Sequence, residues 1–215
     1  PVKENLAAGI LRLTGWQPGE VLLDPMCGSG TFLIEAAQMA LDIAPGLGRG
    51  FAFERLRIHD RGAWAALRRA AEQRRKPARV LPIFGSDVVG EWVRRSRMNL
   101  DAAGLADCVR LDRADVLERT PPAAAGVMVA NPPYGVRIGE AEELLAFYPR
   151  LGDALKQRWG GWRCYLFSAD PELPKRIGLK ASRRTPLFNG ALECRLFEYR
   201  MVAGSNRERT PRPQE

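Results

Sequence analysis

A short apolar run that leads through a glycine-containing loop into a helical pattern constrains the fold of this chain more than any other feature. The run is Val21-Leu22-Leu23-Asp24, the loop carries Gly28 and Gly30, and an apolar-periodic segment begins near Thr31. Glycines let the main chain approach a ligand closely, and the amino end of the helix presents free amides. The spacing matches neither the phosphate loop nor the dinucleotide-binding turn, and no lysine follows the glycines. ATP and NAD are therefore disfavoured.

The acidic residue at the end of this first strand narrows the ligand further. Asp24 directly precedes the loop, and a carboxylate can pair with an ammonium group while glycine amides at a helix amino terminus bind a carboxylate. S-adenosylmethionine carries both groups, so the loop predicts this cofactor. Cys27 lies within the loop, where a contact with the cofactor and simple packing of a small side chain are equally open.

A second motif, Asn131-Pro132-Pro133-Tyr134, follows another apolar, strand-like run at 126–130. The two X-Pro steps restrict the backbone to an extended turn, so the Asn131 side chain and the Pro132 carbonyl can face one point beyond the strand. Both oxygens could accept hydrogen bonds from one amino group, and Tyr134 could stack on the ring that carries it. The alternative is a rigid surface turn, which such dipeptides often form.

Taken together, these motifs resemble those of the class I, S-adenosylmethionine-dependent amino-group methyltransferases, and most closely the bacterial 23S rRNA guanine-N2 methyltransferases that carry a THUMP domain. Segments 3–7, 160–162 and 187–196 resemble the same family, and the resemblance extends from Pro1 to about Met201. It implies that Asn131, Pro132, Pro133 and Tyr134 form the catalytic motif. The expected cofactor contacts are Asn5, Asp24, Pro25, Met26, Cys27, Gly28, Ser29, Gly30, Thr31, Asp87, Val88, Asp115, Val116 and Asn131.

Strand-like and helix-like segments alternate along the chain, a pattern typical of a doubly wound α/β fold. The resemblance implies a Rossmann-like fold with a mainly parallel seven-stranded sheet, helices on both faces and a C-terminal antiparallel hairpin. We expect strands at 21–24, 80–84 (ending near 86–87), 109–111, 127–130 and 163–167, a hairpin of 184–188 with 192–202 joined by Asn189-Gly190, and helices at 4–14, 60–75 and 89–103.

Acidic residues at the ends of the expected strands are candidates for ligand binding, because ligands of such sheets bind beyond the carboxyl ends of the strands. Asp87 could accept both ribose hydroxyls of the cofactor. Asp115 could accept the adenine amino group, with Val116 against the ring. Each aspartate could instead cap the helix that follows it. Asp112 lies close enough to Asp115 that the register of the third strand stays open.

The charge of the chain favours a polyanionic partner, RNA or DNA. The formal net charge is +8 and the isoelectric point about 9.8. Nine basic residues against three acidic ones lie between Glu54 and Arg79, within an insertion at about 45–79 that exceeds an ordinary connection. We expect its helix to turn Trp64 and Leu67 inward, and either to contact phosphates or to be a solvated amphipathic helix.

Three arginines outside the insertion are also candidates for contact with nucleic acid. Arg137 follows the Asn-Pro-Pro-Tyr motif, although a salt bridge to Glu140 or Glu142 is an alternative, and Arg183 and Arg184 precede the expected hairpin.

The composition is that of one catalytic domain, expected at 1–203, with a disordered tail or linker remnant at 204–215. Because the sequence opens on Pro1 rather than methionine, we expect a fragment of a longer protein. The resemblance implies that a THUMP-type RNA-binding domain lies upstream in it. Four scattered cysteines and one histidine predict neither disulfides nor a metal site. With no apolar run near ~20 residues and no secretory signal, we expect a cytoplasmic protein that does not enter membranes.

The sequence therefore predicts transfer of a methyl group from S-adenosylmethionine to the N2 amine of a guanine in 23S rRNA. Positioning is the main catalytic requirement, because the sulfonium methyl is already activated. Asn131 would suit adenine N6 or a glutamine amide as well. The alternatives are a DNA adenine-N6 methyltransferase, another amino-methyltransferase such as one for tRNA guanine N2, and a non-catalytic RNA-binding module.

Overall fold

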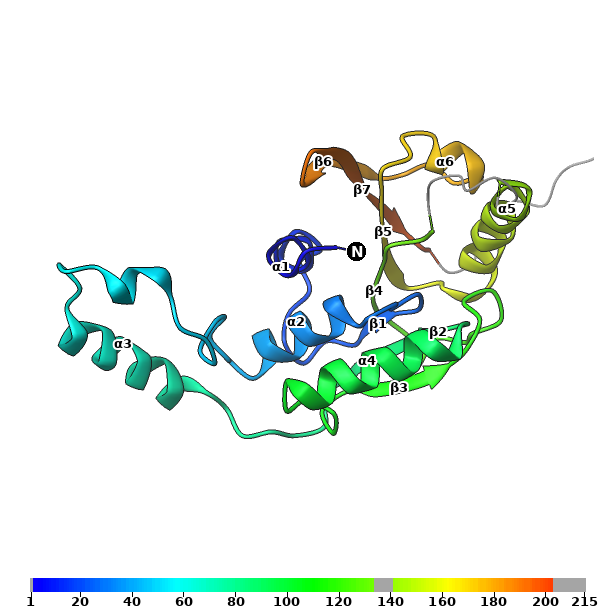
Figure 1. The fold of residues 1–215 in the computed structure, drawn as a ribbon. Helices are drawn as coiled ribbons and strands as arrows, with labels where there is room; N and C mark the ends of the chain where they lie inside the picture. Colours follow the sequence, from blue (N-terminus) through cyan, green and yellow to red (C-terminus); the bar gives the residue numbers. More distant parts are fainter. Residues whose placement is uncertain (1, 134–140, 203–215) are drawn as a thin grey trace, which may run out of the picture.

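A seven-stranded sheet forms the centre of the computed structural model, which describes residues 2–133 and 141–202. Its order is β3-β2-β1-β4-β5-β7-β6, and it is shown in Figure 1. The strands are β1 (Leu22–Asp24), β2 (Ile83–Asp87), β3 (Arg110–Arg113), β4 (Gly126–Ala130), β5 (Trp162–Ser168), β6 (Arg183–Asn189) and β7 (Leu192–Arg200). The first five pair in parallel and β7 is antiparallel to both neighbours, which confirms the predicted Rossmann-like fold. The predicted roles of Tyr134 and Arg137 and the predicted tail lie outside the described residues.

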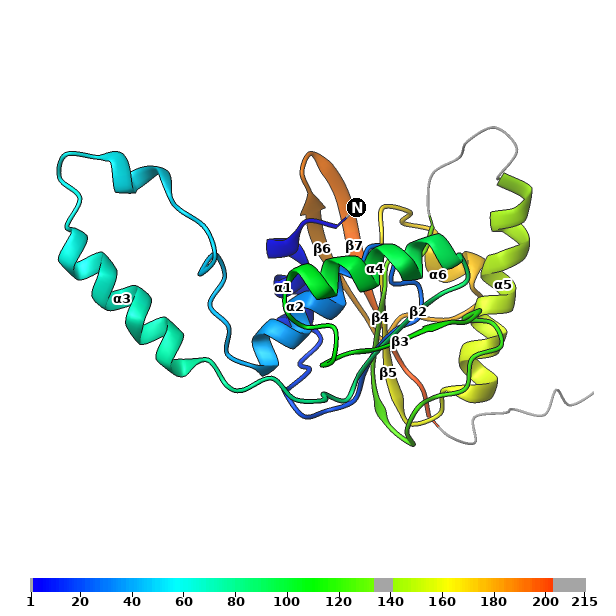
Figure 2. The same cartoon turned by 60° about the horizontal axis from the view of Figure 1, so that its bottom comes forward.

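Helices cover both faces of the sheet (Figures 1 and 2). One core cluster joins α1 (Glu4–Leu13), α2 (Thr31–Ala40) and α4 (Gly90–Ala102), and another joins α5 (Ala141–Arg158) and the short α6 (Leu173–Arg176). The central strands serve both clusters by alternation, since Val127 and Val129 lie in the first cluster and Met128 and Ala130 in the second. This explains why β4 is an unbroken apolar run: both of its faces are buried.

Two features of the carboxyl-terminal half differ from the sequence analysis. The analysis identifies no element between 131 and 162, yet α5 fills most of this interval, and Pro149 inside the helix obscures its apolar periodicity. The hairpin turn is also shifted by one residue. Asn189 pairs with Leu192, so the two turn residues are Gly190 and Ala191, and Gly190 has the positive φ of +67° that such a turn requires.

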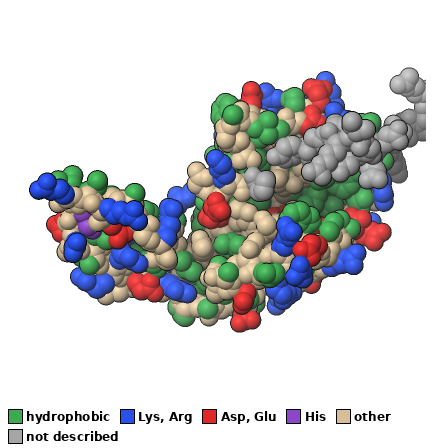
Figure 3. Space-filling model, viewed as in Figure 1, with side chains coloured by type: hydrophobic (Ala, Val, Ile, Leu, Met, Phe, Trp, Pro, Cys, Tyr) green, Lys and Arg blue, Asp and Glu red, His purple; other side chains and the backbone are tan. Residues whose placement is uncertain are grey.

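The predicted insertion forms an arm, residues 45–79, that projects from the sheet (Figures 1 and 2). It contains the 3-10 helix η1 (Ala52–Arg55) and α3 (Arg61–Arg74), and Figure 3 shows lysine and arginine side chains gathered over it. Trp64 packs edge-on against Phe51 and Phe53, with ring centroids 5.6 and 4.9 Å apart. The prediction for Leu67 was wrong: its side chain is 64% exposed, because the arm is too small to bury both residues.

Within the described ranges, no helix is long and apolar enough to span a membrane, and no three His, Cys, Asp or Glu residues lie close enough together to hold a metal. All four cysteines are buried and free.

Two glycines in helices provide a matched test of the packing between α5 and α6. A Cβ on Gly152 would lie 1.8 Å from the Ile177 carbonyl oxygen, whereas a Cβ on Gly9 in α1 would meet nothing within 4 Å. We expect Gly152→Ala to lower the free energy of unfolding by about 1–3 kcal/mol or more, because the helices must separate. Gly9→Ala should raise it by about 0.5–1 kcal/mol through helix propensity. Urea denaturation of both variants measures this, and equal shifts would contradict the packing account.

Candidate active site

The glycine loop between β1 and α2 forms a tight turn at the carboxyl end of the sheet. Gly28 and Gly30 have φ values of +52° and +85°, a region that residues with a Cβ rarely adopt. Gly30 is the N-cap of α2, which begins at Thr31 as expected, and its amide donates to the Cys27 carbonyl oxygen at 2.8 Å. The loop thus carries the backbone conformation that its sequence predicts.

Asp87, at the end of β2, connects the glycine loop to the second strand. Its Oδ2 accepts a hydrogen bond from the Gly28 amide at 3.1 Å, and its Oδ1 accepts one from the Val89 amide at 3.0 Å, just before α4 begins. The side chain is 8% exposed, and the neighbouring Val88 is exposed. Because a carboxylate has about four lone-pair sites, these two bonds leave acceptor capacity for a ligand.

Helix α4 holds the loop from its other side through residues that the sequence analysis did not identify. Ser96 Oγ donates to the Gly28 carbonyl oxygen at 2.6 Å, and Asn99 Nδ2 donates to the Ser29 carbonyl oxygen at 2.9 Å. A Cβ on Gly30 would lie 3.0 Å from Ser96 Oγ, so this glycine also permits the close approach of α4. These contacts join segments about seventy residues apart, which no local pattern in the sequence reveals.

Cys27 is part of this packing. Its Sγ lies 3.6 Å from Ser96 Oγ and its side chain is buried. Burial, with a smaller effect from the nearby Asp24, raises the pKa of the Cys27 thiol to about 12. The thiol therefore stays protonated at neutral pH, which supports the packing interpretation over a role as a nucleophile.

Asp24, at the end of β1, is a buried carboxyl group for which no described residue supplies a cation. It is 1% exposed, and its Oδ1 accepts a hydrogen bond from the Met26 amide at 3.1 Å. Burial raises the pKa of Asp24 to about 8; the Met26 hydrogen bond opposes this shift and the charge of Asp87 adds to it. A buried acid beside a glycine loop fits a cationic ligand, because an ammonium would favour the ionised form.

Asn131 follows β4, the strand next to β1, and presents an unsatisfied acceptor. Its Oδ1 is buried, and no donor among the described residues reaches it. Leaving a buried acceptor without a donor costs about 1–3 kcal/mol. A ligand that donates a hydrogen bond to Asn131 Oδ1 would remove this cost. This is the arrangement that the sequence analysis predicts for an acceptor of an amino group.

The Pro-Pro turn that carries Asn131 is fixed by a residue that the sequence analysis missed. The hydroxyl of Tyr148, on α5, donates a hydrogen bond to the Pro133 carbonyl oxygen. Tyr148 is buried, and burial, with a smaller effect from Asp170, raises its pKa to about 12. The hydroxyl therefore remains a donor at neutral pH. Pro132 is buried and Pro133 exposed, so the turn is anchored on one side only.

The third strand, β3, ends at Arg113, two residues beyond the end expected at 111. Asp112 lies within β3 and pairs with Arg119 at 3.2 Å, whereas Asp115 lies past the end of the strand. Asp115 is partly buried, and its Oδ1 accepts the Leu117 amide at 2.9 Å. Val116 packs into the core cluster on the α5 side. Asp115 rather than Asp112 is therefore the residue at the carboxyl edge.

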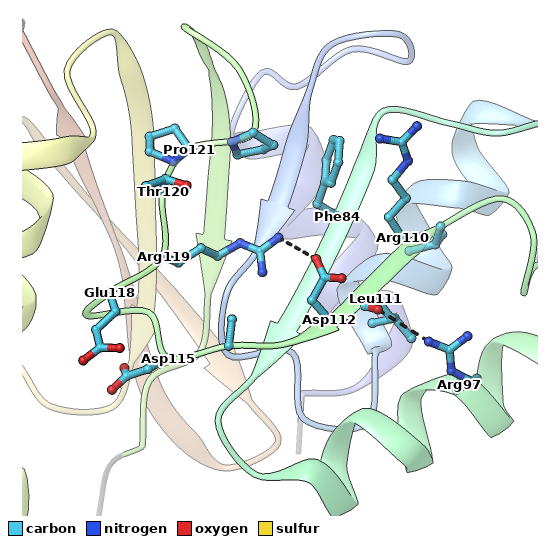
Figure 4. A pocket seen from close by; sticks show the side chains of 13 residues that line it. Phe84, Arg97, Arg110, Leu111, Asp112, Asp115, Glu118, Arg119, Thr120 and Pro121 are labelled. Atoms are coloured by element: carbon cyan, nitrogen blue, oxygen red, sulfur yellow. Dashed lines mark hydrogen bonds and ion pairs between the residues drawn. The ribbon is translucent and has the colours of Figure 1, made fainter.

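A cavity of about 910 Å³ lies against β2 and β3 beside this region (Figure 4). Phe84 and Leu111 line its apolar part, and the ion pair between Asp112 and Arg119 borders it. Of the residues predicted to contact the cofactor, only Asp115 lines this cavity. The cavity is therefore adjacent to the predicted cofactor residues rather than formed by them.

The predicted arginines lie farther from this cluster. Arg183 and Arg184 are exposed on the edge strand β6. The strand register aligns Arg184 through β7 and β5 with Ala130, which precedes Asn131. Three strand spacings separate the two, roughly 14 Å. The structure thus brings Asp24, the glycine loop, Asp87 and Asn131 together and leaves the two arginines peripheral, while Asn5 is exposed on α1.

Comparisons with known proteins agree with this geometry. A family model described as "RMKL-like, methyltransferase domain" matches residues 1–198. The ribosomal RNA large subunit methyltransferase K/L of Shewanella baltica (strain OS185) is 44% identical over 216 residues, which is 98% of this chain but 30% of that protein. The solved structure of SMU.472 complexed with SAH (S-adenosylhomocysteine) has a TM-score of 0.87 at 33% identity, over 94% of this chain and 53% of that one. A "predicted N6-adenine-specific DNA methylase" from Listeria monocytogenes has a TM-score of 0.83 at 32% identity, over 94% and 52%.

The raised pKa of Asp24 predicts how stability depends on pH. In the unfolded chain the carboxyl has its ordinary pKa of 3.8, whereas in the folded protein its pKa is about 8. The folded state therefore binds more protons, and stability falls as pH rises between these values. Asp24→Asn keeps the acceptor for Met26 and removes the charge. We expect it to stabilise the protein by an amount on the order of a few kcal/mol at neutral pH and by almost nothing near pH 4.

Denaturation of wild type and variant across this pH range, without added ligands, makes the measurement. Asp153→Asn, at an exposed ion pair with Lys156, is the control and should change stability by less than about 1 kcal/mol. A stability gain for Asp24→Asn that does not depend on pH would contradict the assignment.

Proposed function

This chain belongs to the family of RMKL-like methyltransferase domains, and from this premise we propose that it transfers a methyl group from S-adenosylmethionine to the N2 amine of a guanine in 23S rRNA. The domain uses S-adenosylmethionine, in keeping with relatives crystallised with S-adenosylhomocysteine. The observation that carries the proposal for the acceptor is the buried Asn131 Oδ1, which has no donor among the described residues. It lies at the end of β4, next to the strand that leads into the glycine loop.

The residues of the cofactor half fit S-adenosylmethionine, which supplies an activated methyl group on a sulfonium. Asp24 is suited to the ammonium, because it is a buried acid without a cationic partner among the described residues. The amides of the loop around Gly28 and Gly30 are suited to the carboxylate. Asp87 would accept the ribose hydroxyls with its remaining lone pairs, and Asp115 the adenine amino group.

In the acceptor half, the protein orients a poor nucleophile. Asn131 Oδ1 and the Pro132 carbonyl would each accept a hydrogen bond from one N–H of the exocyclic amine, so that the nitrogen lone pair turns toward the methyl group. Tyr148 fixes the same turn through the Pro133 carbonyl, which leaves the Pro132 carbonyl for the substrate. Alignment of this kind supplies much of the rate where no proton must be removed before the reaction. In this proposal Tyr134 stacks on the extruded base.

RNA is favoured over other acceptors by charge and by the named relatives. The formal net charge is +8, and the Shewanella relative is named for ribosomal RNA. Because the chain spans 30% of that protein's length, the relative has room for further domains. We infer that a THUMP-type RNA-binding domain accompanies this one in a longer, cytoplasmic protein, with the catalytic domain at 1–203.

A second candidate is adenine-N6 methylation of DNA. The Asn131 carboxamide oxygen would accept a hydrogen bond from the amine at adenine N6 as readily as from that at guanine N2, and the similar Listeria structure carries an adenine-specific DNA methylase name. The deciding experiment is methyl transfer from labelled S-adenosylmethionine to protein-free 23S rRNA, beside tRNA and DNA, followed by nucleoside analysis. N2-methylguanosine from 23S rRNA alone supports the proposal, N6-methyladenine in DNA supports the second candidate, and cofactor binding without transfer refutes catalysis by this domain alone.

Asn131→Ala should separate catalysis from cofactor binding. We expect the methyl transfer rate to fall by about 100-fold or more, by analogy with loss of a preorganised hydrogen-bonding group in other enzymes, while the dissociation constant of S-adenosylmethionine changes little. Asn131→Asp keeps an acceptor and should retain more activity than the alanine variant. Single-turnover rates and calorimetric titration give the two quantities; a parallel loss of both would refute the assigned role.

Tyr148→Phe tests the positioning role of α5. Loss of the hydrogen bond to the Pro133 carbonyl oxygen removes about 0.5–1.5 kcal/mol of the free energy that holds the turn in place. We therefore expect a roughly three- to tenfold lower kcat with unchanged cofactor affinity. Tyr199→Phe is the matched control, because Tyr199 is buried in the same core cluster and its hydroxyl has no partner among the described residues. If both variants lower kcat equally, Tyr148 has no specific role.

A further inference from the structure

Nearly all of the net charge of this protein is concentrated in the arm. Residues 45–79 contain ten basic and three acidic side chains, a net charge of +7, compared with +8 for the entire chain. The rest of the chain is therefore almost neutral overall. Figure 3 shows the arm as a separate lobe with many basic side chains among hydrophobic and a few acidic ones. An attraction for polyanions would thus act mainly through the arm.

The acidic residues of the arm are engaged in its own structure. Glu54 Oε1 accepts the Phe51 amide at 2.7 Å, Asp60 Oδ1 accepts the Ala63 amide at 2.9 Å at the start of α3, and Glu72 pairs with Arg75. Several arginines, in contrast, are exposed and make no hydrogen bond or ion pair with another described residue; they are Arg55, Arg57, Arg61, Arg69 and Arg79. These guanidinium groups are free to bind phosphates.

The aromatic residues of the arm indicate which form of nucleic acid fits. Phe51, Phe53 and Trp64 pack against one another, with ring centroids 4.9 to 5.6 Å apart, and Arg49 lies 4.8 Å from the centroid of the Phe51 ring. Proteins that bind single strands use open aromatic faces on which bases stack. Here the rings pack on one another, and of the three only Phe53 is exposed, at 40%, while Phe51 and Trp64 are half-buried. Because much of the ring surface is already in contact, the arm offers mainly charge for a phosphate backbone rather than open stacking surfaces for bases.

The arm joins the domain near the amino ends of the strands, whereas the active site lies at their carboxyl ends. It leaves the carboxyl end of α2 and returns to the start of β2, and the Lys76 amide donates to the Leu41 carbonyl oxygen at 2.8 Å where the two ends meet. Helix α2 has ten residues, so its length separates this junction from the glycine loop by about 15 Å. Figures 1 and 2 show the arm extending still farther away.

We propose that the arm is a second RNA-binding surface, which holds the phosphate backbone of a double-helical RNA region remote from the reacting base. The inference rests on the proposed function, because it takes the substrate to be RNA. It adds that the substrate must be long and folded: a nucleotide in the active site cannot reach the arm, whereas a helix that continues from it can. The arm thereby selects structured RNA through electrostatic attraction, while the active site selects the base.

Two variants of equal charge test this. The arm variant is R57Q/R61Q/R69Q, and the control is R12Q/R94Q/R150Q, which removes three exposed arginines from α1, α4 and α5. The probe is a labelled RNA duplex of about 20 base pairs, longer than the roughly 16 that double-stranded RNA-binding domains span. Its affinity for the full chain is measured over a range of salt concentrations with S-adenosylhomocysteine present, so that no turnover occurs.

We expect the arm variant to bind the duplex at least about tenfold more weakly, with a salt dependence reduced by about two to three in slope, one for each lost phosphate contact. The control should change the slope by less than about one. Both variants should bind S-adenosylhomocysteine like wild type, which shows that they are folded. Equal losses in the two variants would mean that net charge alone attracts RNA, and no loss in either would assign the arm to another partner, such as a protein; both results overturn the proposal.

The outcome is independent of whether the chain methylates guanine. If the arm variant alone loses duplex affinity while no RNA becomes methylated, the binding surface stands and the proposed reaction fails. If methyl transfer to 23S rRNA proceeds equally in the arm variant and the control, with the same KM, the reaction stands and the arm proposal fails.

Discussion

The bond between the Gly28 amide and the Asp87 carboxylate is the contact on which the arrangement of the site depends. It joins the loop that follows β1 to the end of β2, so the two halves of the cofactor region cannot shift independently. Because β1 also pairs with β4, the same strand that is held by this bond positions the turn carrying Asn131. The strand ladders set the relative position of the three strand ends, and this carboxylate fixes the glycine loop upon them, where ligands of such folds bind.

The two faces of the sheet support different parts of the candidate site. Helix α4, on one face, fixes the glycine loop through Ser96 and Asn99. Helix α5, on the other face, fixes the Pro-Pro turn through Tyr148. The two helices belong to separate core clusters, so packing changes in one layer can alter cofactor binding without moving the acceptor turn. Groups held by rigid elements in this way are well suited to a reaction that depends on alignment.

The sequence predicts the strand ends well because their signals are local. Apolar runs that end in an acid or an amide locate Asp24, Asp87 and Asn131, and the rule for open sheets brings them together. The supporting contacts could not be predicted, since Ser96 and Tyr148 meet their partners only after the chain has folded, across sequence separations of 68 and 15 residues. The predicted burial of Leu67 in the arm was wrong for a related reason. Helical periodicity indicates which side of a helix is apolar, but the arm has no larger core against which that side can be buried.

The buried Asp24 carboxyl gives the cofactor a role beyond chemistry. Without a cation nearby, this group opposes folding at neutral pH, since its pKa is raised to about 8 by burial. An ammonium that neutralises it would relieve that opposition, and any ligand that binds only the folded state shifts the folding equilibrium in proportion to its concentration. The supply of cofactor in the cell would then help to determine how long a molecule of this protein survives, and a shortage would remove the protein as well as slow its reaction.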